Sequence, residues 1–198
     1  EFRKDLDAFR PTSATSLGNL INLVRTGLAH SIGSDWPDPG AVRSQWLESP
    51  TQAKGLTRAG RFVRVSYRVA DVQKDAWFGL RLIITPGGLD WSQGSAGLIG
   101  SHNRAVLAEP FGVGEAKRSL PTSMPKNLEQ FFTTFNRTDA AEAVYDVLTV
   151  LVAELSGDYR LPASMVGVGS MGPICLAARA MVPPVVARTS RLRTVIDM

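Results

Sequence analysis

The fold of this chain is decided by one stretch, Met165-Val166-Gly167-Val168-Gly169-Ser170-Met171-Gly172-Pro173-Ile174. A short apolar run enters it, glycines crowd its middle, and a helix-forming run, Cys175–Met181, follows it. Because glycine allows sharp backbone turns, this order predicts a strand, a tight turn and a helix. Such a turn serves two chemistries. With a serine at its apex it presents a nucleophile above a sheet, and as Gly-x-Gly-x-x-Gly it cradles the phosphates of a dinucleotide.

The composition is that of one globular domain. Of the 198 residues, 44% are hydrophobic and 20% are charged, which is enough to bury a sizeable core. The net charge is +4, but the basic residues are scattered. The densest group, Arg188, Arg191 and Arg193, is too small to indicate a nucleic-acid partner. No apolar run reaches about 18 residues, so we expect no membrane span.

The sequence holds one cysteine, Cys175, which excludes an internal disulfide and a metal site built from several cysteines. We expect neither a metal nor a cofactor. The first residue is Glu1 rather than methionine, and no hydrophobic signal core follows it. We therefore expect a processed or trimmed piece of a protein, and the cellular compartment stays open.

Residues 1–60 are expected to form a helical preface to the main domain, residues 61–198. Apolar residues recur at helical spacing in its first half, at Leu17, Leu20, Ile21, Val24 and Leu28. Ser16 is the expected N-cap of this helix. A second short helix is expected around Val42–Leu47.

The main domain begins with a strand in which apolar and polar residues alternate, Arg61–Val69. Two more apolar runs, Ala76–Thr85 and Ala105–Glu109, predict buried strands. The strongest helix covers 136–155, where valines and leucines make one apolar stripe. A last strand is expected at Thr194–Met198. Alternation of strands and helices predicts an α/β fold, with a mostly parallel sheet covered by helices on both faces.

Three glycine-rich loops follow strands of this sheet, at Pro86–Trp91, Pro110–Glu115 and Gly167–Gly172. The carboxyl ends of parallel strands share one edge of a sheet, and ligands of such sheets bind beyond that edge. We therefore expect the functional site where these three loops meet.

The order of these pieces resembles the first half of an α/β-hydrolase. The matching segments are the Gly-Gly loop after a strand, Ile83–Gly88; the end of the next strand and its loop, Glu109–Glu115; the helix Asn136–Leu155; the elbow and its helix, Val166–Met181; and the strand Val195–Met198. Within the superfamily the chain looks most like acetyl-xylan-esterase-like and dienelactone-hydrolase-like members. The resemblance implies that 61–198 is the N-terminal portion of the fold, to about its sixth strand.

The resemblance also implies a set of catalytic groups. Ser170 would be the nucleophile and Asp197 the orienting acid. The Met171 N–H would form one half of the oxyanion hole, and the N–H of Gly88 or Leu89 the other half.

Two departures from the family pattern leave alternatives open. The usual elbow is Gly-x-Ser-x-Gly, and Ser170 matches Gly172 but has Val168 where the first glycine belongs. The register shifted by one residue matches Gly167 and puts Gly169 in the nucleophile slot, without a hydroxyl.

The order of the triad is the second departure, because it runs serine, acid, histidine along an α/β-hydrolase chain. Both histidines here, His30 and His102, precede Ser170. We therefore expect the catalytic histidine outside this chain, in a missing C-terminal segment or a partner chain that completes the sheet.

The predicted function is hydrolysis of a carbohydrate ester or small acyl ester by a serine nucleophile. One alternative is a degenerate hydrolase fold used for binding or assembly, which Gly169 in the nucleophile slot would suggest. A weaker alternative is a dinucleotide-binding unit, with Asp197 as its ribose-binding acid.

Overall fold

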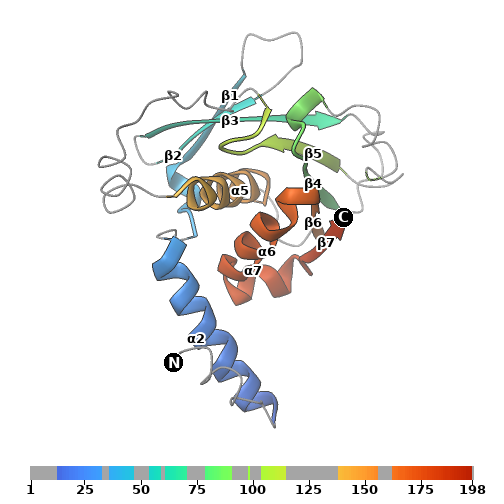
Figure 1. Ribbon diagram of the computed structural model, residues 1–198. Helices are drawn as coiled ribbons and strands as arrows, with labels where there is room; N and C mark the ends of the chain where they lie inside the picture. The colour runs from blue at the N-terminus through green and yellow to red at the C-terminus, as the bar shows by residue number, and fades with distance from the viewer. Residues whose placement is uncertain are drawn as a thin grey trace, which may run out of the picture.

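The computed structural model describes residues 13–32, 36–46, 54–58, 61–70, 79–90, 98, 104–114, 138–155 and 162–197. These residues build a seven-stranded sheet with the strand order β1-β2-β3-β5-β4-β6-β7 (Figure 1). The strands are β1 (Val42–Trp46), β2 (Lys54–Arg58), β3 (Arg61–Ala70), β4 (Leu80–Ile84), β5 (Arg104–Glu109), β6 (Ala163–Val168) and β7 (Arg193–Asp197). The helices are α2 (Ala14–Ile32), α5 (Asp139–Leu155), α6 (Gly172–Met181) and α7 (Pro184–Thr189), with short 3₁₀ turns η1 (Pro39–Ala41), η2 (Gly88–Asp90) and η4 (Gly169–Met171).

The four strands β4 to β7 run parallel, while β1, β2 and β3 pair antiparallel at the other side of the sheet. In the central ladder Ile84 is level with Ala108 of β5 and with Gly167 of β6. The carboxyl ends of β4, β5 and β6 therefore meet at one edge. The expected α/β class is confirmed.

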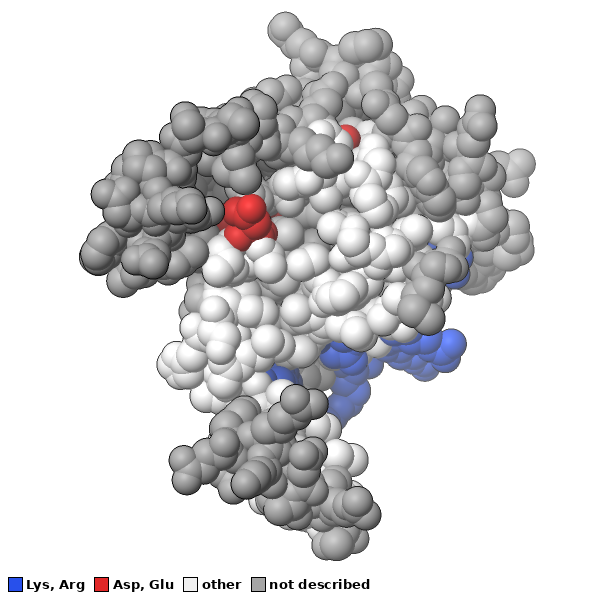
Figure 2. Space-filling model, in the orientation of Figure 1, with Lys and Arg blue, Asp and Glu red and all other residues white. Residues whose placement is uncertain are grey.

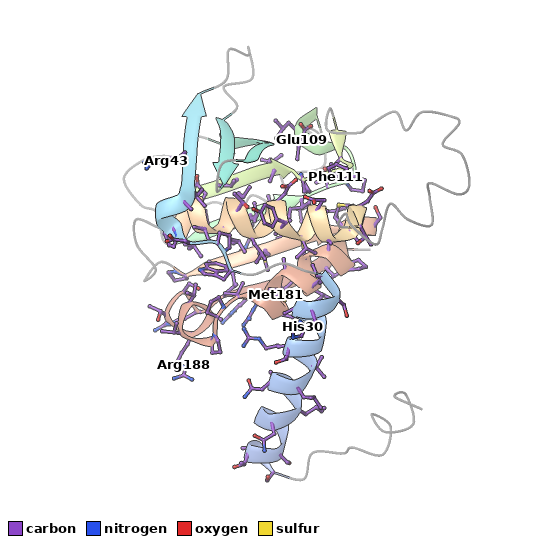
Figure 3. The ribbon with its side chains drawn as sticks, turned by 90° about the vertical axis from the view of Figure 1, so that its left-hand side faces the viewer. His30, Arg43, Glu109, Phe111, Met181 and Arg188 are labelled. Atoms are coloured by element: carbon purple, nitrogen blue, oxygen red, sulfur yellow. The ribbon has the colours of Figure 1, made fainter. Side chains whose placement is uncertain are left out.

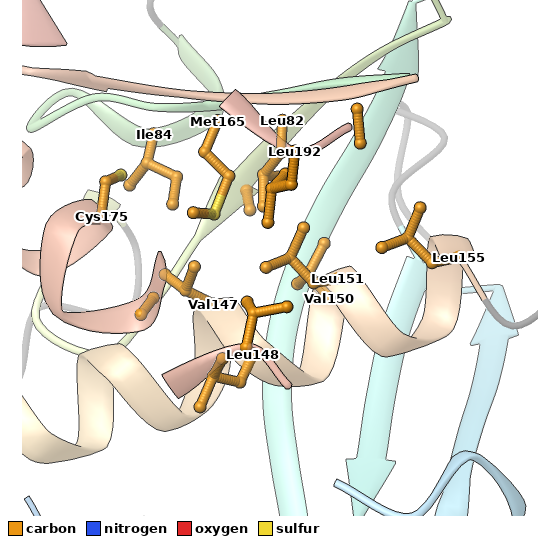
Figure 4. Close-up of a cluster of buried hydrophobic side chains, with 14 of the residues drawn as sticks. Leu82, Ile84, Val147, Leu148, Val150, Leu151, Leu155, Met165, Cys175 and Leu192 are labelled. Atoms are coloured by element: carbon orange, nitrogen blue, oxygen red, sulfur yellow. The ribbon is translucent and has the colours of Figure 1, made fainter. Parts of the chain in front are cut away.

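Helix α5 carries the core of the domain. Thr138 caps its first turn, because the Thr138 hydroxyl accepts the Ala141 N–H at 3.2 Å. The apolar stripe of α5 packs with α6 on one face of the sheet, and Figure 4 shows Leu148 and Leu151 of α5 in the same cluster as Met165 of β6. This stripe is what the 3.6-residue spacing predicts.

The opposite face of the sheet buries a second cluster, formed by Ile83, Ala105 and Val166 from three neighbouring strands. Leu98, a helical residue in the connection from β4 to β5, packs against it. Among the described residues, helices α5 and α6 cover one face of the sheet, and Leu98 is the one helical residue placed on the other.

Helix α2 projects from the body of the molecule (Figure 1). The expected N-cap Ser16 is wrong: the helix begins at Ala14, so Ser13 is the capping residue and Ser16 is the third helical residue. The Ser16 N–H donates to the Ser13 hydroxyl at 3.1 Å, and the Ser13 N–H donates to the Ser16 hydroxyl at 2.9 Å. Its last turns, with Leu28 and Ile32, pack on the core cluster.

The helix expected around Val42–Leu47 is wrong, because Val42–Trp46 is strand β1. This strand pairs antiparallel with β2, so the sheet begins before residue 61. Only Val42 and Trp46 of the five residues are apolar, so the segment shows no clear alternation, and it gains its backbone hydrogen bonds by pairing with β2 rather than within a helix. Among the described helices, none is both long and apolar enough to cross a bilayer.

Candidate functional site

The turn after β6 has its apex at Gly169. Strand β6 ends at Val168, and Gly169 follows with φ +54°, a conformation that is strained for residues with a side chain. The 3₁₀ turn η4 and helix α6 continue from it. In a nucleophile elbow, the nucleophile is the residue at this strained strand-to-helix turn. Here that position holds a glycine.

Ser170 lies one residue past the apex, in η4. It is exposed, and no described residue forms a hydrogen bond with its hydroxyl. Met171 follows as the N-cap residue of α6, and its half-buried side chain packs on the core cluster. The residues after the strained position therefore serve the entry to the helix.

The other two glycines of the turn allow α6 to approach the sheet closely. A methyl group on Gly167 would lie 2.8 Å from Cys175 Sγ and 2.8 Å from the Met171 carbonyl oxygen. A methyl group on Gly172 would lie 2.7 Å from Ile196 Cγ2 of β7. All three distances are shorter than real carbon contacts. At Gly167 one of the atoms is backbone, so packing requires glycine there, whereas at Gly172 the Ile196 side chain would have to shift.

The turn faces the loop after β4. Strands β4 and β6 are neighbours in the sheet. The chain continues from β4 to β5 in one direction along the strand order, and from β6 to β7 in the opposite direction. Crevices for ligands form at such a point. A methyl group on Gly169 would lie 3.8 Å from Pro86 Cγ and would meet no closer atom, so there is room for a side chain at the apex.

Glu109 ties together the loops after β4 and β5. The Leu89 N–H donates to Glu109 Oε1 at 2.9 Å, and the Glu109 side chain is buried at 5% exposure. Gly88 and Gly114 flank the carboxylate so closely that a methyl group on either would collide with it. The Gly88 N–H donates to the Thr85 carbonyl oxygen at 3.2 Å. Both loop N–H groups that the sequence predicts as oxyanion donors are thus engaged within the chain.

Asp146 is a second buried carboxylate at this edge, which the sequence reasoning missed. It lies on α5, and its Oδ2 accepts the Phe111 N–H of the loop after β5 at 2.8 Å. The signal was present, because an aspartate inside a buried helix stripe needs a partner to offset its desolvation. Figure 3 shows Phe111 and Glu109 at the same end of the sheet.

Asp197 and the two histidines are the remaining residues that a catalytic triad could use. The backbone of Asp197 is level with Val168, so the end of β7 lies beside the turn. His102 lies outside the described residues, and His30 is an exposed residue of α2, apart from Glu109 and Phe111 (Figure 3). In the described part of the chain, the structure therefore brings no histidine to Ser170.

The thiol of Cys175 lies beside Gly167 of the turn. Burial raises the pKa of the Cys175 thiol from 9.0 to about 12, so the thiol stays protonated at neutral pH and is a poor nucleophile. The described residues contain no group of three or more His, Cys, Asp or Glu side chains that could hold a metal ion.

Comparisons with known proteins identify no family for this chain. No family model matches the sequence, and no curated protein matches it. A solved structure described as the crystal structure of a thermostable esterase is 12% identical, with a TM-score of 0.23 over 80% of this chain and 55% of that chain. The chain thus spans about half the length of that esterase. The parallel sheet of this chain is itself consistent with a partial α/β-hydrolase-like fold.

Proposed function

We propose that this chain is a catalytically degenerate α/β-hydrolase-like domain that serves binding or assembly. One observation carries the proposal: the strained residue directly after β6 is Gly169, with φ +54°. A serine nucleophile is effective because the turn lifts its hydroxyl above the sheet beside the oxyanion donors. A glycine at that position supplies no hydroxyl, and Ser170 is already in the turn that begins the helix.

The loop after β4 supports the same proposal. Oxyanion stabilisation requires N–H groups that are free to meet the developing charge. The Leu89 N–H donates instead to Glu109, and the Gly88 N–H to the Thr85 carbonyl. A substrate oxyanion would have to displace a buried carboxylate, which costs the hydrogen bond and the packing around it.

A second candidate is the ester hydrolase predicted from the sequence. It is favoured by the exposed hydroxyl of Ser170 at the carboxyl edge, one residue from the apex. In this mechanism a histidine from outside the chain takes the Ser170 proton, Asp197 orients that histidine, and the Met171 N–H binds the oxyanion. The substrate would be a carbohydrate ester or a small acyl ester.

The dinucleotide alternative has weaker support. A phosphate at a helix N-terminus is held by the free N–H groups of the first turn. Pro173 occupies that turn of α6 and has no N–H to offer. An absence of any thermal shift on adding NAD, NADP or a flavin would exclude this alternative.

The experiment that tests the proposal measures covalent labelling by a fluorophosphonate probe and turnover of p-nitrophenyl acetate. It compares the full-length protein with its Ser170→Ala variant. We expect equal, background labelling and turnover in both, because no nucleophile occupies the apex. Labelling or turnover that disappears with Ser170→Ala would overturn the proposal and establish the hydrolase.

A further inference from the structure

Among the described residues, the end of the molecule formed by α2, α6 and α7 carries arginines and no acidic residue. In the described ranges 13–32 and 162–196, no aspartate or glutamate occurs, and Asp197 follows at the end of β7. The same ranges hold Arg25, Arg179, Arg188, Arg191 and Arg193. In Figure 2 the blue side chains gather below the body of the molecule, whereas the red ones appear only higher up. This surface is therefore complementary to an acidic partner.

Two of these arginines meet at the C-terminus of α6. Arg25 of α2 donates from Nη2 to the Val182 carbonyl oxygen at 2.5 Å. Val182 is the C-cap residue of α6, and its own N–H donates to the Arg179 carbonyl oxygen at 3.3 Å. Figure 3 shows this end of α6, at Met181, close to α2 near His30. The backbone thus sets Arg179 one turn from the carbonyl that Arg25 caps.

No carboxylate among the described residues pairs with Arg25 or Arg179, although both are half-buried. Burial and the charge of Arg25 together lower the pKa of Arg179. Two like charges held together repel each other, and an anion bound to both removes this repulsion. A carboxylate fits the donor geometry of guanidinium groups especially well.

An uncovered apolar stripe lies beside this arginine pair on α2. Leu17, Ile21 and Val24 occupy one face of the helix and are 45%, 47% and 46% exposed. The same face continues to Leu28, which packs on the core cluster. A partner laid on the stripe would therefore extend the core of the domain along α2.

We propose that the α2 stripe (Leu17, Ile21 and Val24) and the arginine pair (Arg25 and Arg179) form a docking surface for an acidic amphipathic helix of another polypeptide. The partner covers the stripe with apolar side chains and inserts a carboxylate between the two guanidinium groups. This inference rests on the proposed binding function and names the chemistry of the partner.

A polypeptide fits this surface better than a membrane does. A helix that lies on an anionic membrane carries several lysines or arginines on its polar face. Arg25 is the one arginine in α2, which has no lysine, and its guanidinium is turned to the α6 carbonyl. The positive charge of Arg25 therefore lies at the contact between α2 and α6 and is not part of a row of basic residues along α2.

The test measures fluorescence polarisation of a labelled synthetic helix, about four turns long, with leucines on one face and glutamates beside them. We expect saturable binding to the full-length protein that weakens as salt is added, because the arginine pair contributes charge attraction. Arg179→Gln and Ile21→Asp should each raise the Kd about tenfold. The first removes a guanidinium group of the arginine pair, and the second places a charge in the apolar stripe.

Two matched variants serve as controls. Leu23→Asp changes an α2 leucine that is 63% exposed but lies off the stripe, and Arg43→Gln changes an exposed arginine on β1 (Figure 3). Neither should change the Kd. A control peptide with lysine in place of glutamate should not bind.

Three results would overturn the inference. They are no saturable binding of the acidic helix, equal weakening by Leu23→Asp and Ile21→Asp, or binding to vesicles of phosphatidylcholine and phosphatidylserine with none to the peptide. Ester turnover dependent on Ser170 would instead contradict the proposed function, and it would leave the peptide result standing as a separate observation.

Discussion

At the carboxyl edge of the sheet, single residues decide what chemistry is available. Gly169 gives the turn its sharp backbone but no reactive atom. The Glu109 carboxylate accepts the Leu89 N–H and lies between two glycines, Gly88 and Gly114, where a methyl group would collide with it. The edge combines a sharp strand-to-helix turn with polar groups that satisfy one another. Such mutual satisfaction stabilises loops and removes the unpaired donors that catalysis needs.

The contribution of Glu109 can be measured by substitution. Glu109→Ala leaves the Leu89 N–H without its acceptor, so we expect the free energy of unfolding to fall by about 2–3 kcal/mol. Glu109→Gln keeps an acceptor oxygen in place and should lose about half as much. Urea denaturation measures both. Asp139→Ala removes an exposed carboxylate and serves as the control, with a loss of less than about 1 kcal/mol. An equal effect of all three substitutions would contradict the role of Glu109.

Two glycines of the turn should differ in their tolerance of a methyl group. Gly169→Ala makes only an ordinary contact with Pro86, so its cost is that of the positive φ, about 1–2 kcal/mol. Gly167→Ala places the methyl group against Cys175 and backbone atoms of the turn, so we expect a larger loss, about 3 kcal/mol. Melting temperatures and urea midpoints should rank the variants in this order. The reverse ranking would mean that the strain at Gly169 is misassigned.

At the scale of elements, the sequence predicts long periodic segments best. The stripe of α5 repeats over four turns, and the helix covers Asp139–Leu155 as its spacing indicates. Strand β1 is not predicted because a five-residue segment carries little periodicity, and its pairing partner β2 lies further along the chain. Short strands depend on partners that are distant in sequence, so local patterns identify them poorly.

The candidate site shows the same limit. The three glycine-rich loops are predicted by composition, and the order of strands predicts that they meet. The hydrogen bond from Leu89 to Glu109 depends on the register that sets Ile84 level with Ala108. The apex at Gly169 depends on β6 ending at Val168, and one residue either way would move a different side chain into that position.

Helix α5 is the element whose packing should matter most for stability. Leu148 is fully buried within the core cluster, so Leu148→Ala leaves a cavity. We expect a loss of about 3–4 kcal/mol in the free energy of unfolding. Leu176→Ala on α6 removes the same atoms from a side chain that is 49% exposed, and it should cost less than half as much. Hydrogen exchange of the α5 amides should accelerate only in the first variant.

At the scale of the whole molecule, charge and core are distributed unevenly. Among the described residues, acidic side chains occur at Asp38, at the end of β5 (Glu109) and on α5, whereas helices α2, α6 and α7 contain arginine and no acidic residue. The core cluster runs from α5 through β4 and β6 to α6, so these elements should unfold together. A probe buried within this cluster therefore reports the stability of the domain.

Cys175 is such a probe, and its titration links the stability of the whole domain to pH. The thiol is fully buried between α6 and β6, and burial raises its pKa from 9.0 to about 12. Below pH 9 the folded and unfolded states both keep the proton, so the stability is unaffected. As the pH rises from 9 toward 12, the unfolded chain releases the proton while the folded chain retains it. The free energy of unfolding must then fall, by about 1.4 kcal/mol for each pH unit.

The comparison with Cys175→Ala isolates this contribution from the other groups that titrate in the same range. The variant loses a small buried side chain, which lowers its stability by an amount independent of pH. Urea denaturation at pH 7 to 11 should therefore give a wild-type stability that declines toward the variant's above pH 9. The thiol itself should react with Ellman's reagent only at the rate at which the domain opens, because the native side chain is buried. Parallel pH profiles for the two proteins, together with rapid labelling under native conditions, would show that Cys175 is accessible and that the α6–β6 packing is looser than the structure describes.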